Sequence, residues 1–284
     1  MVFRKNNRYF ESDSKGNKLP YLEAIAITFL RDKQSEYSQF LQGNIDFISG
    51  LDGSYKDDIL TPQGQLKDKH MGSIKMLKSP YLNTEYLGFF MNPNMNKDSS
   101  RLLRQAFNYG FDRKKMIAFL RNNIGNPGYG GIIPKGLAGY DVSIGFEYNP
   151  KKAKALVSEY KKQSNNEMPN LKISTTENYL SFCEFIQRAL QDIGLFIEID
   201  VMPASALKSA KANGKTTVFR ASWVADYPDA QNYLSLFYSE NFAPKGPNYT
   251  HFKNEKFDRI YKSAMKETND SITVSYTHLR AHET

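Results

Sequence analysis

The feature that most constrains the fold is an alternation of strand-like and helix-like segments in the second half of the chain. The strand-like runs are residues 171–175, 197–201 and 217–220, and the amphipathic stretches between them are residues 179–193 and 205–214. A strand–helix–strand–helix–strand order predicts a parallel sheet with right-handed crossovers. The sequence therefore predicts an α/β fold with the residues after Arg220 at the carboxyl edge of a sheet.

Start signals mark several of the expected helices. Asn149 followed by Pro150 is typical of a helix start, because Asn caps free backbone N–H groups and Pro fits the first turn. Ser99 and Asp112 are expected to cap two helices earlier in the chain, and Ser205 is expected to cap the helix at 205–214. These caps predict where the helices begin.

The other expected elements are shorter. Strands are expected at residues 24–30, 45–48, 74–77 and 85–91, and helices at 36–42, around 59–60 and at 257–267. Residues 122–149 are rich in Gly and Pro and are expected to be an irregular connection. The Gly125–Gly131 run within them resembles a phosphate-binding loop only superficially, because no strand leads into it and no Lys-Ser or Lys-Thr closes it.

Composition narrows the function classes. The 284 residues include 38 basic and 30 acidic side chains, and the lysine pairs lie on expected helices without a helix-turn-helix, zinc-finger or RNA-binding signature. We therefore expect no nucleic-acid partner and keep nucleic-acid binding as a minor alternative. The single Cys183 excludes an internal disulfide framework and is expected to be a small buried residue. No run is long and apolar enough to span a bilayer, and Met1–Lys5 opens no signal peptide.

The candidate functional site is the stretch after the third strand. It contains Trp223, which is the only tryptophan of the sequence, together with Asp226, Tyr227 and Asp229. In open α/β sheets, ligands bind outside the carboxyl ends of strands, which is where these residues are expected. The alternative interpretation is a surface loop whose Trp223 packs on the core.

The residue types of this stretch favour binding over catalysis. The carboxylate of Asp226 in a partly dry site favours a cationic group such as an amine, and Arg220 offers a guanidinium for a ligand carboxylate. If the segment is extended, Ser222 and Val224 can pair their backbone groups with a ligand strand. An amine, an amide backbone and a carboxylate together describe a peptide.

Two enzyme-like alternatives remain weaker. Asp226 and Asp229 could form the carboxylate pair of a hydrolase, although a proline turn separates them and their side chains need not converge. His278, His282 and Glu283 have the spacing of a helical metal site, but they lie in a tail that does not look native. We expect no catalytic residue, no cofactor and no metal.

Several blocks resemble one family, in the same order along the chain. They are Gln42–Asp46, Tyr86–Phe89, Arg101–Arg113, Ile133–Tyr140, Tyr148–Leu156 and Trp223–Asp229. Together they resemble the peptide- and nickel-binding class of extracellular solute-binding proteins, family 5, which supply ABC importers. The resemblance implies an α/β, periplasmic-binding-protein-like fold of type II, with two lobes that close on a ligand.

The resemblance also implies roles for individual residues. It places the ligand α-amine on Asp226, a pocket wall at Trp223, and the ligand carboxylate within reach of Arg220. The expected ligand-binding residues are Arg220, Ser222, Trp223, Val224, Asp226 and Tyr227. The implied partners are a peptide and the permease subunits of an ABC importer, with the binding protein acting as a monomer. A nickel complex, haem or a sugar is an alternative ligand within this family.

The chain departs from the family pattern at both ends. The family normally starts with a signal peptide and a longer first-lobe segment, and residues 275–284 look like translated sequencing adapter. We therefore expect a fragment with part of lobe one at 1–83, lobe two at 84–270 and a non-native tail at 271–284. The full-length parent is expected in the periplasm or on the outer face of the cell envelope.

Overall fold

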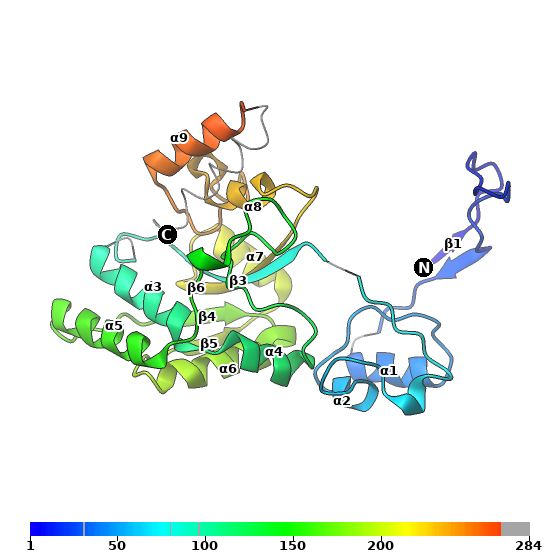
Figure 1. Ribbon diagram of the computed structural model, residues 1–284, viewed down its shortest axis with the longest axis horizontal. Helices are drawn as coiled ribbons and strands as arrows, with labels where there is room; N and C mark the ends of the chain where they lie inside the picture. The colour runs from blue at the N-terminus through cyan, green and yellow to red at the C-terminus, as the bar shows by residue number, and fades with distance from the viewer. Residues whose placement is uncertain (31, 80, 96, 268–284) are drawn as a thin grey trace. The chain divides into compact units, whose positions relative to one another are not determined.

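The computed structural model describes residues 1–30, 32–79, 81–95 and 97–267 (Figure 1). Contacts between residues divide the chain into two compact units, of which the first is Met1–Ile59 and the second begins at Leu60. The expected boundary between residues 83 and 84 concerns the lobes of the family fold, and it stays a prediction. The expected non-native tail at 271–284 lies outside the described residues, as do His278, His282 and Glu283.

The first unit is small and has few buried side chains. Its elements are β1 (Val2–Arg4), β2 (Ala24–Ala26), α1 (Lys33–Leu41) and α2 (Lys56–Ile59). β1 and β2 pair antiparallel, and all their residues are exposed. Its core is built on Tyr37 and Tyr55, whose rings stack with centroids 4.3 Å apart.

The second unit is built on a four-stranded mixed sheet. Its strands are β3 (Asn83–Phe89), β4 (Lys172–Thr175), β5 (Glu198–Val201) and β6 (Val218–Val224), in the order β3-β6-β4-β5. β4 pairs parallel with both β5 and β6, whereas β3 pairs antiparallel with β6. The predicted α/β class is therefore confirmed. β4, β5 and β6 form the predicted parallel part of the sheet, and β3 adds an antiparallel strand.

Helices cover both faces of this sheet (Figure 1). The α-helices are α3 (Asp98–Gly110), α4 (Arg113–Arg121), α5 (Pro150–Gln163), α6 (Leu180–Gln191), α7 (Ala204–Ala212), α8 (Gln231–Leu234) and α9 (Glu255–Ala264). The 3₁₀ helices are η1 (Asp68–His70), η2 (Val142–Ile144), η3 (Glu177–Tyr179), η4 (Ser235–Phe237) and η5 (Ser239–Asn241). α3, α5 and α6 pack on one face, and Leu207 of α7 packs with Phe219 and Ala221 on the other.

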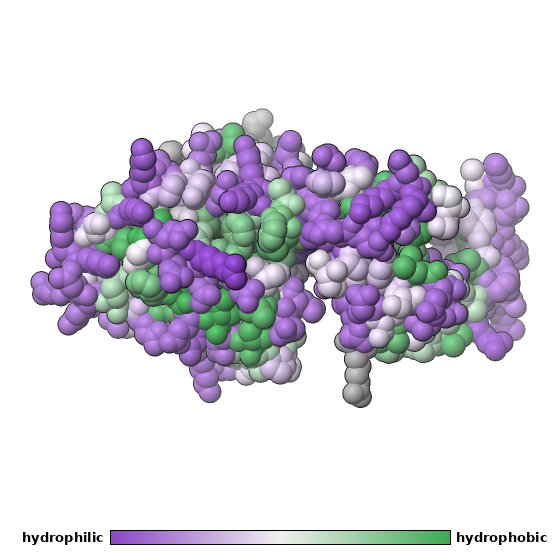
Figure 2. Space-filling view, turned by 90° about the horizontal axis from the view of Figure 1, so that it is seen from below, coloured by the Kyte–Doolittle hydropathy of each residue, from purple (hydrophilic) through white to green (hydrophobic). Residues whose placement is uncertain are grey.

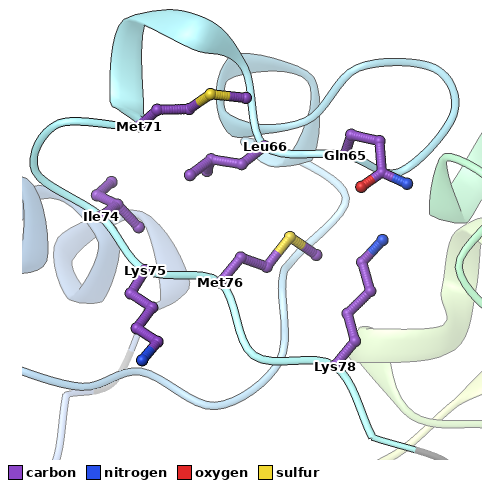
Figure 3. A pocket seen from close by; sticks show the side chains of 7 residues that line it. All are labelled: Gln65, Leu66, Met71, Ile74, Lys75, Met76 and Lys78. Carbon is purple, nitrogen blue, oxygen red and sulfur yellow. The ribbon is translucent and has the colours of Figure 1, made fainter.

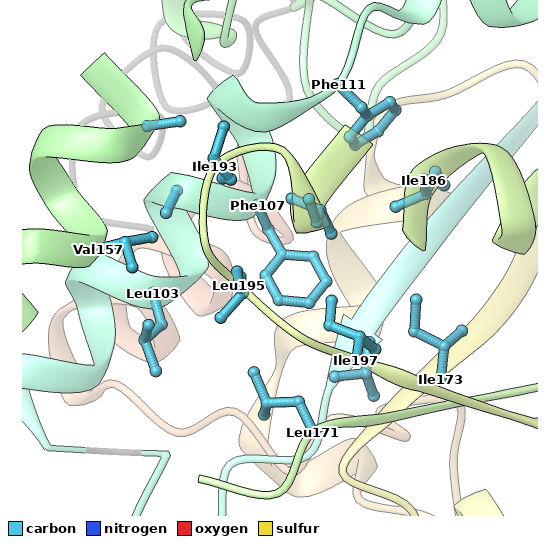
Figure 4. Packing of buried hydrophobic residues seen from close by; sticks show 14 of the residues in the cluster. Leu103, Phe107, Phe111, Val157, Leu171, Ile173, Ile186, Ile193, Leu195 and Ile197 are labelled. Atoms are coloured by element: carbon cyan, nitrogen blue, oxygen red, sulfur yellow. The ribbon is translucent and has the colours of Figure 1, made fainter. Parts of the chain in front are cut away.

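The main hydrophobic core lies between α3, α5, α6 and the sheet. Phe107 of α3 lies among branched aliphatic side chains of this core (Figure 4), and its ring meets that of Phe89 edge-on at 5.0 Å. Leu103, one turn earlier on α3, is completely buried. The expected buried state of Cys183 is confirmed, because its side chain is 1% exposed in this core and burial raises the pKa of its thiol.

Two of the four predicted helix caps are confirmed. Asn149 accepts a hydrogen bond from the backbone N–H of Lys152, and Asp112 accepts one from Lys115, each at 3.0 Å. The predictions for Ser99 and Ser205 are wrong. α3 begins at Asp98 and α7 at Ala204, because the residues before them, a lysine and a proline, already hold the extended backbone of an N-cap.

Several strand predictions for the first half are wrong. Residues 45–48 and 74–77 form no strand, and only Ala24–Ala26 of the predicted 24–30 strand is a β-strand. Apolar runs become strands only where a partner completes their backbone hydrogen bonds. β6 is longer than the predicted strand at 217–220. It continues to Val224 because β3 pairs with it along its whole length.

Polar residues dominate the surface. Hydrophilic residues cover most of the face shown in Figure 2, with hydrophobic patches between them. Every helix in the described part of the chain is too short or too polar to cross a bilayer.

Truncating the core side chain of Leu103 tests this packing. Leu103→Ala should lower the free energy of unfolding by about 2–5 kcal/mol, because it removes fully buried methyl groups and leaves a cavity. Leu77→Ala is the matched control, since Leu77 is 73% exposed and its loss should change stability by less than about 0.5 kcal/mol. Urea unfolding followed by circular dichroism measures both, and equal effects would contradict the assignment of this core.

Candidate functional site

β6 offers one unpaired backbone edge at its carboxyl end. Backbone hydrogen bonds from Ala225 to Leu82 and from Phe90 to Thr217 fix which β6 residues face β3. Because this orientation alternates along an antiparallel ladder, the backbone groups of Ser222 and Val224 face the opposite edge. On that edge the pairing with β4 ends at Phe219. Within the described chain, these backbone groups of Ser222 and Val224 are thus open to an added strand.

A buried amide holds the end of β6 and the loop that follows it. The Oδ1 atom of Asn232 accepts a hydrogen bond of 2.7 Å from the indole N–H of Trp223 and one of 3.3 Å from the backbone N–H of Asp226. Asn232 is 4% exposed and lies at the start of α8. Trp223 also packs against the aromatic cluster around Tyr233. One side chain therefore fixes both the tryptophan and the acid-bearing turn.

Asp226 and Tyr227 lie at the surface of this turn. The carboxylate of Asp226 is exposed, and among the described residues no cation forms an ion pair with it. The Tyr227 side chain is 51% exposed, and its hydroxyl donates a hydrogen bond to Gln231. The structure thus presents an unneutralised carboxylate just past the open edge of β6.

Arg220 lies at the other end of that edge and is largely buried. Its Cζ atom lies 3.2 Å from the centroid of the Tyr179 ring, and its Nη2 atom lies 3.4 Å from Oε1 of Glu85. Among the described residues, Nε and Nη2 of Arg220 nevertheless find no hydrogen-bond acceptor. Arg220 therefore has a partial counter-ion in its own chain and two unsatisfied donors.

Asp229 has a local structural role. Its Oδ1 atom accepts a hydrogen bond of 2.6 Å from the backbone N–H of Gln231, which fixes the turn into α8. A carboxylate engaged in this way gives little support to a catalytic pair with Asp226. Within the described residues, no group of three or more His, Cys, Asp or Glu side chains could hold a metal ion.

Comparison with known families decides the family of the chain. The family model described as "Bacterial extracellular solute-binding proteins, family 5 Middle" matches residues 1–245. The chain belongs to this family. The resemblance predicted from the sequence blocks is thereby confirmed.

Relatives of this family 5 chain are binding proteins. It is 22% identical over 286 residues to the oligopeptide-binding protein OppA of Bacillus subtilis, covering 95% of this chain and 48% of the relative. It is 24% identical over 254 residues to heme-binding protein A of Haemophilus influenzae, covering 87% of this chain and 44% of the relative. The chain thus spans about half the length of the curated relatives it matches.

A solved structure confirms the fold. The periplasmic binding protein DppA from Helicobacter pylori, in complex with the peptide STSA, superposes with a TM-score of 0.76 at 22% identity. The match covers 99% of this chain and 52% of that chain. The predicted two-lobed binding-protein class is therefore confirmed for the family 5 chain.

Two pockets lie in the second unit. One, of about 430 Å³, lies at the carboxyl ends of β4 and β5 and is lined by residues 176–178 and 201–204. The other, of about 420 Å³, lies within residues 65–78, where Leu66, Met71 and Met76 line one hollow (Figure 3). The first is at the edge of the sheet where ligands of α/β proteins bind. Neither pocket is lined by a predicted site residue.

Sequence reasoning missed the residues that support the site. Asn232 follows Trp223 by nine positions, and its role depends on a turn whose geometry is not readable from the sequence. Glu85 lies on β3, across from Ser222, and its pairing with Arg220 follows from a strand pairing between distant segments. The sequence predicted a strand at 85–91 and marked Tyr86–Phe89 as family-like, but neither signal pairs Glu85 with Arg220.

Removing the Asn232 amide tests how the turn is held. Asn232→Ala leaves the buried indole N–H of Trp223 without its acceptor, which should cost about 1–3 kcal/mol of stability. Emission from Trp223, the only tryptophan in the sequence, should shift and become more accessible to a soluble quencher. Asn213→Ala is the control, because its amide only donates to Ser209 on the exposed end of α7. Unchanged quenching in Asn232→Ala would refute this role.

Proposed function

We propose that this protein is the solute-binding component of an ABC importer and that it binds peptides along the open edge of β6. The main support for this proposal is the order of chemical groups along β6 and the turn that follows it. Ser222 and Val224 present free backbone donors and acceptors, with a guanidinium before them at Arg220 and a carboxylate after them at Asp226. A peptide has the complementary order of carboxylate, amides and amine.

The spacing of the charged groups suits a short peptide. At about 3.3 Å per residue, the six steps from Arg220 to Asp226 span about 20 Å, which is the length of an extended peptide of about six residues. Backbone pairing on a strand edge gives affinity without regard to side-chain identity. This recognition mode suits a receptor that takes up peptides of varied sequence.

In the proposal, Asp226 receives the ligand α-amine. An ammonium group supplies three donors, and its charge-assisted bonds to a carboxylate are stronger than neutral ones. Asp226 has no cation of its own chain within ion-pair distance among the described residues, so a ligand amine meets no internal competitor. Trp223 and Tyr227 flank this position and provide aromatic surface for the first ligand residues.

We propose that a second lobe covers the binding site when a ligand is bound. Relatives are about twice as long as this chain. Periplasmic binding proteins as a class close two domains around their ligands. We infer that a second lobe buries Asp226 when a ligand is bound, which strengthens the ion pair by excluding water. The permease of the importer is the inferred partner, and the periplasm or outer face of the envelope is the inferred location, in keeping with the extracellular family description.

Other ligands are less well matched to the described residues. A haem-binding relative belongs to the same set of matches, so similarity alone does not select the ligand. The strand edge supports a peptide ligand, because it offers backbone hydrogen bonds, and the described residues contain no cluster of metal ligands. The hydrolase alternative loses support because Asp229 is engaged in the turn into α8.

A peptide with a free amine and its N-acetylated twin test the role of Asp226. Calorimetric titration of the intact protein should show tighter binding of the free amine, and Asp226→Asn should weaken that binding by about 10- to 100-fold, the loss of one charge-assisted bond. The N-acetylated peptide should bind both proteins alike. Asp229→Asn is the matched control and should keep the preference for the free amine. Equal affinity of wild type for the two peptides would rule out amine recognition.

A further inference from the structure

Three side chains converge on one carboxylate oxygen of Glu85 beside the open edge of β6. Oε1 of Glu85 lies 3.4 Å from Nη2 of Arg220, 3.5 Å from Nη2 of Arg121 and 3.3 Å from the hydroxyl of Tyr179. Arg121 ends α4, and its Cζ atom lies 4.9 Å from the centroid of the Phe182 ring on α6. Three separate elements thus bring two guanidinium groups and one carboxylate together.

The charges in this cluster do not balance. Glu85 contributes one negative charge, whereas Arg121 and Arg220 contribute two positive charges, so one positive charge is in excess. In the described part of the chain, neither arginine has an ion pair with any other carboxylate. The three contacts to Oε1 are all long for hydrogen bonds, which indicates a loosely held counter-ion.

The arginine donors are also incompletely used. Nε and Nη2 of Arg220 are buried with no acceptor in the described part of the chain, and such donors carry the full cost of lost hydration. The Arg121 side chain is 38% exposed and the Glu85 side chain 34% exposed, while Arg220 is 16% exposed. The cluster is therefore accessible from the Arg121 and Glu85 side, with Arg220 behind them. An incoming anion would meet two planar guanidinium groups, each held against an aromatic ring.

The cluster lies beside the backbone groups assigned to the ligand. Glu85 pairs directly with Ser222 across the β3–β6 ladder, so their side chains lie on the same face of the sheet. Arg220 lies on that face as well, two residues before Ser222. A carboxylate that ends a strand added at Ser222 would reach this cluster.

We propose that Arg121 and Arg220 together form the subsite for the ligand carboxylate and that Glu85 is the resident counter-ion that this carboxylate displaces. The proposal rests on the proposed function and deepens it, because it adds Arg121 as a second carboxylate-binding residue. Glu85 competes with the ligand and thereby lowers the affinity for a free carboxylate. The subsite selects ligands with a free carboxyl terminus over amides.

The direction of the affinity change in Glu85→Gln distinguishes a competing counter-ion from a structural residue. Glu85→Gln removes the competing charge and should raise affinity for a carboxylate ligand about two- to fivefold, the usual strength of a partly exposed ion pair. Arg121→Gln should lower that affinity by a similar factor. If Glu85 only holds the two arginines in place, Glu85→Gln should instead lower the affinity for a carboxylate ligand, because the arginines would lose their fixed positions.

N-acetylglycine and its amide are the probes, because neither has an amine for Asp226. Chemical-shift titration of the intact protein should show weak binding of N-acetylglycine, stronger in Glu85→Gln and weaker in Arg121→Gln, with no response to the amide. Glu159→Gln and Arg188→Gln make the same changes in charge on α5 and α6, away from the cluster, and should behave as wild type. Circular dichroism checks that each variant folds.

The outcomes separate this proposal from the proposed function. Unchanged or weaker binding of N-acetylglycine by Glu85→Gln, no effect of Arg121→Gln, or no binding by any variant overturns the carboxylate subsite, even where free peptides bind. The expected trend with N-acetylglycine supports the subsite, even where the free-amine peptide binds no better than its acetylated twin. In that second case only the proposed recognition of the amine by Asp226 is refuted, and the carboxylate subsite stands.

Discussion

The pairing of β6 with β3 is the constraint on which the site depends. β3 covers one edge of β6 from Val218 to Val224, while β4 covers the other edge only to Phe219. The carboxyl end of β6 is therefore held as a strand by one neighbour and left open on the opposite side. A strand edge held rigid in this way can accept a further strand without first paying the entropy of becoming extended.

Asn232 and the aromatic cluster around Tyr233 give this edge its fixed end. The hydroxyl of Tyr233 donates a hydrogen bond of 2.6 Å to the backbone carbonyl of Leu82, which precedes β3, while Asn232 binds the indole of Trp223 and the backbone of Asp226. Two neighbouring residues of α8 thus tie together the end of β6 and the start of β3. This arrangement keeps an exposed carboxylate at a defined distance from the strand.

Much of the fold could be predicted from residue patterns. The alternation of strands and helices from Pro150 to Arg220 predicted β4, α6, β5, α7 and β6 in the correct order, because local periodicity and helix-start signals agree there. The runs at 45–48 and 74–77 misled the same reasoning, since an apolar run does not reveal whether a partner strand exists. For the site, Ser222 and Val224 were expected to be extended only conditionally, and pairing with β3 decided the matter.

The sequence by itself determined the family, the α/β class and the stretch that holds Trp223 and Asp226, because these are properties of local pattern and residue type. The tertiary structure alone decided which edge of β6 is open and which groups surround Arg220. Glu85, Arg121 and Tyr179 come from three elements separated by 36 to 94 positions, and only the folded sheet brings them to one oxygen atom. Contacts of that range depend on how strands pair and helices pack, and no local pattern in a single sequence encodes them.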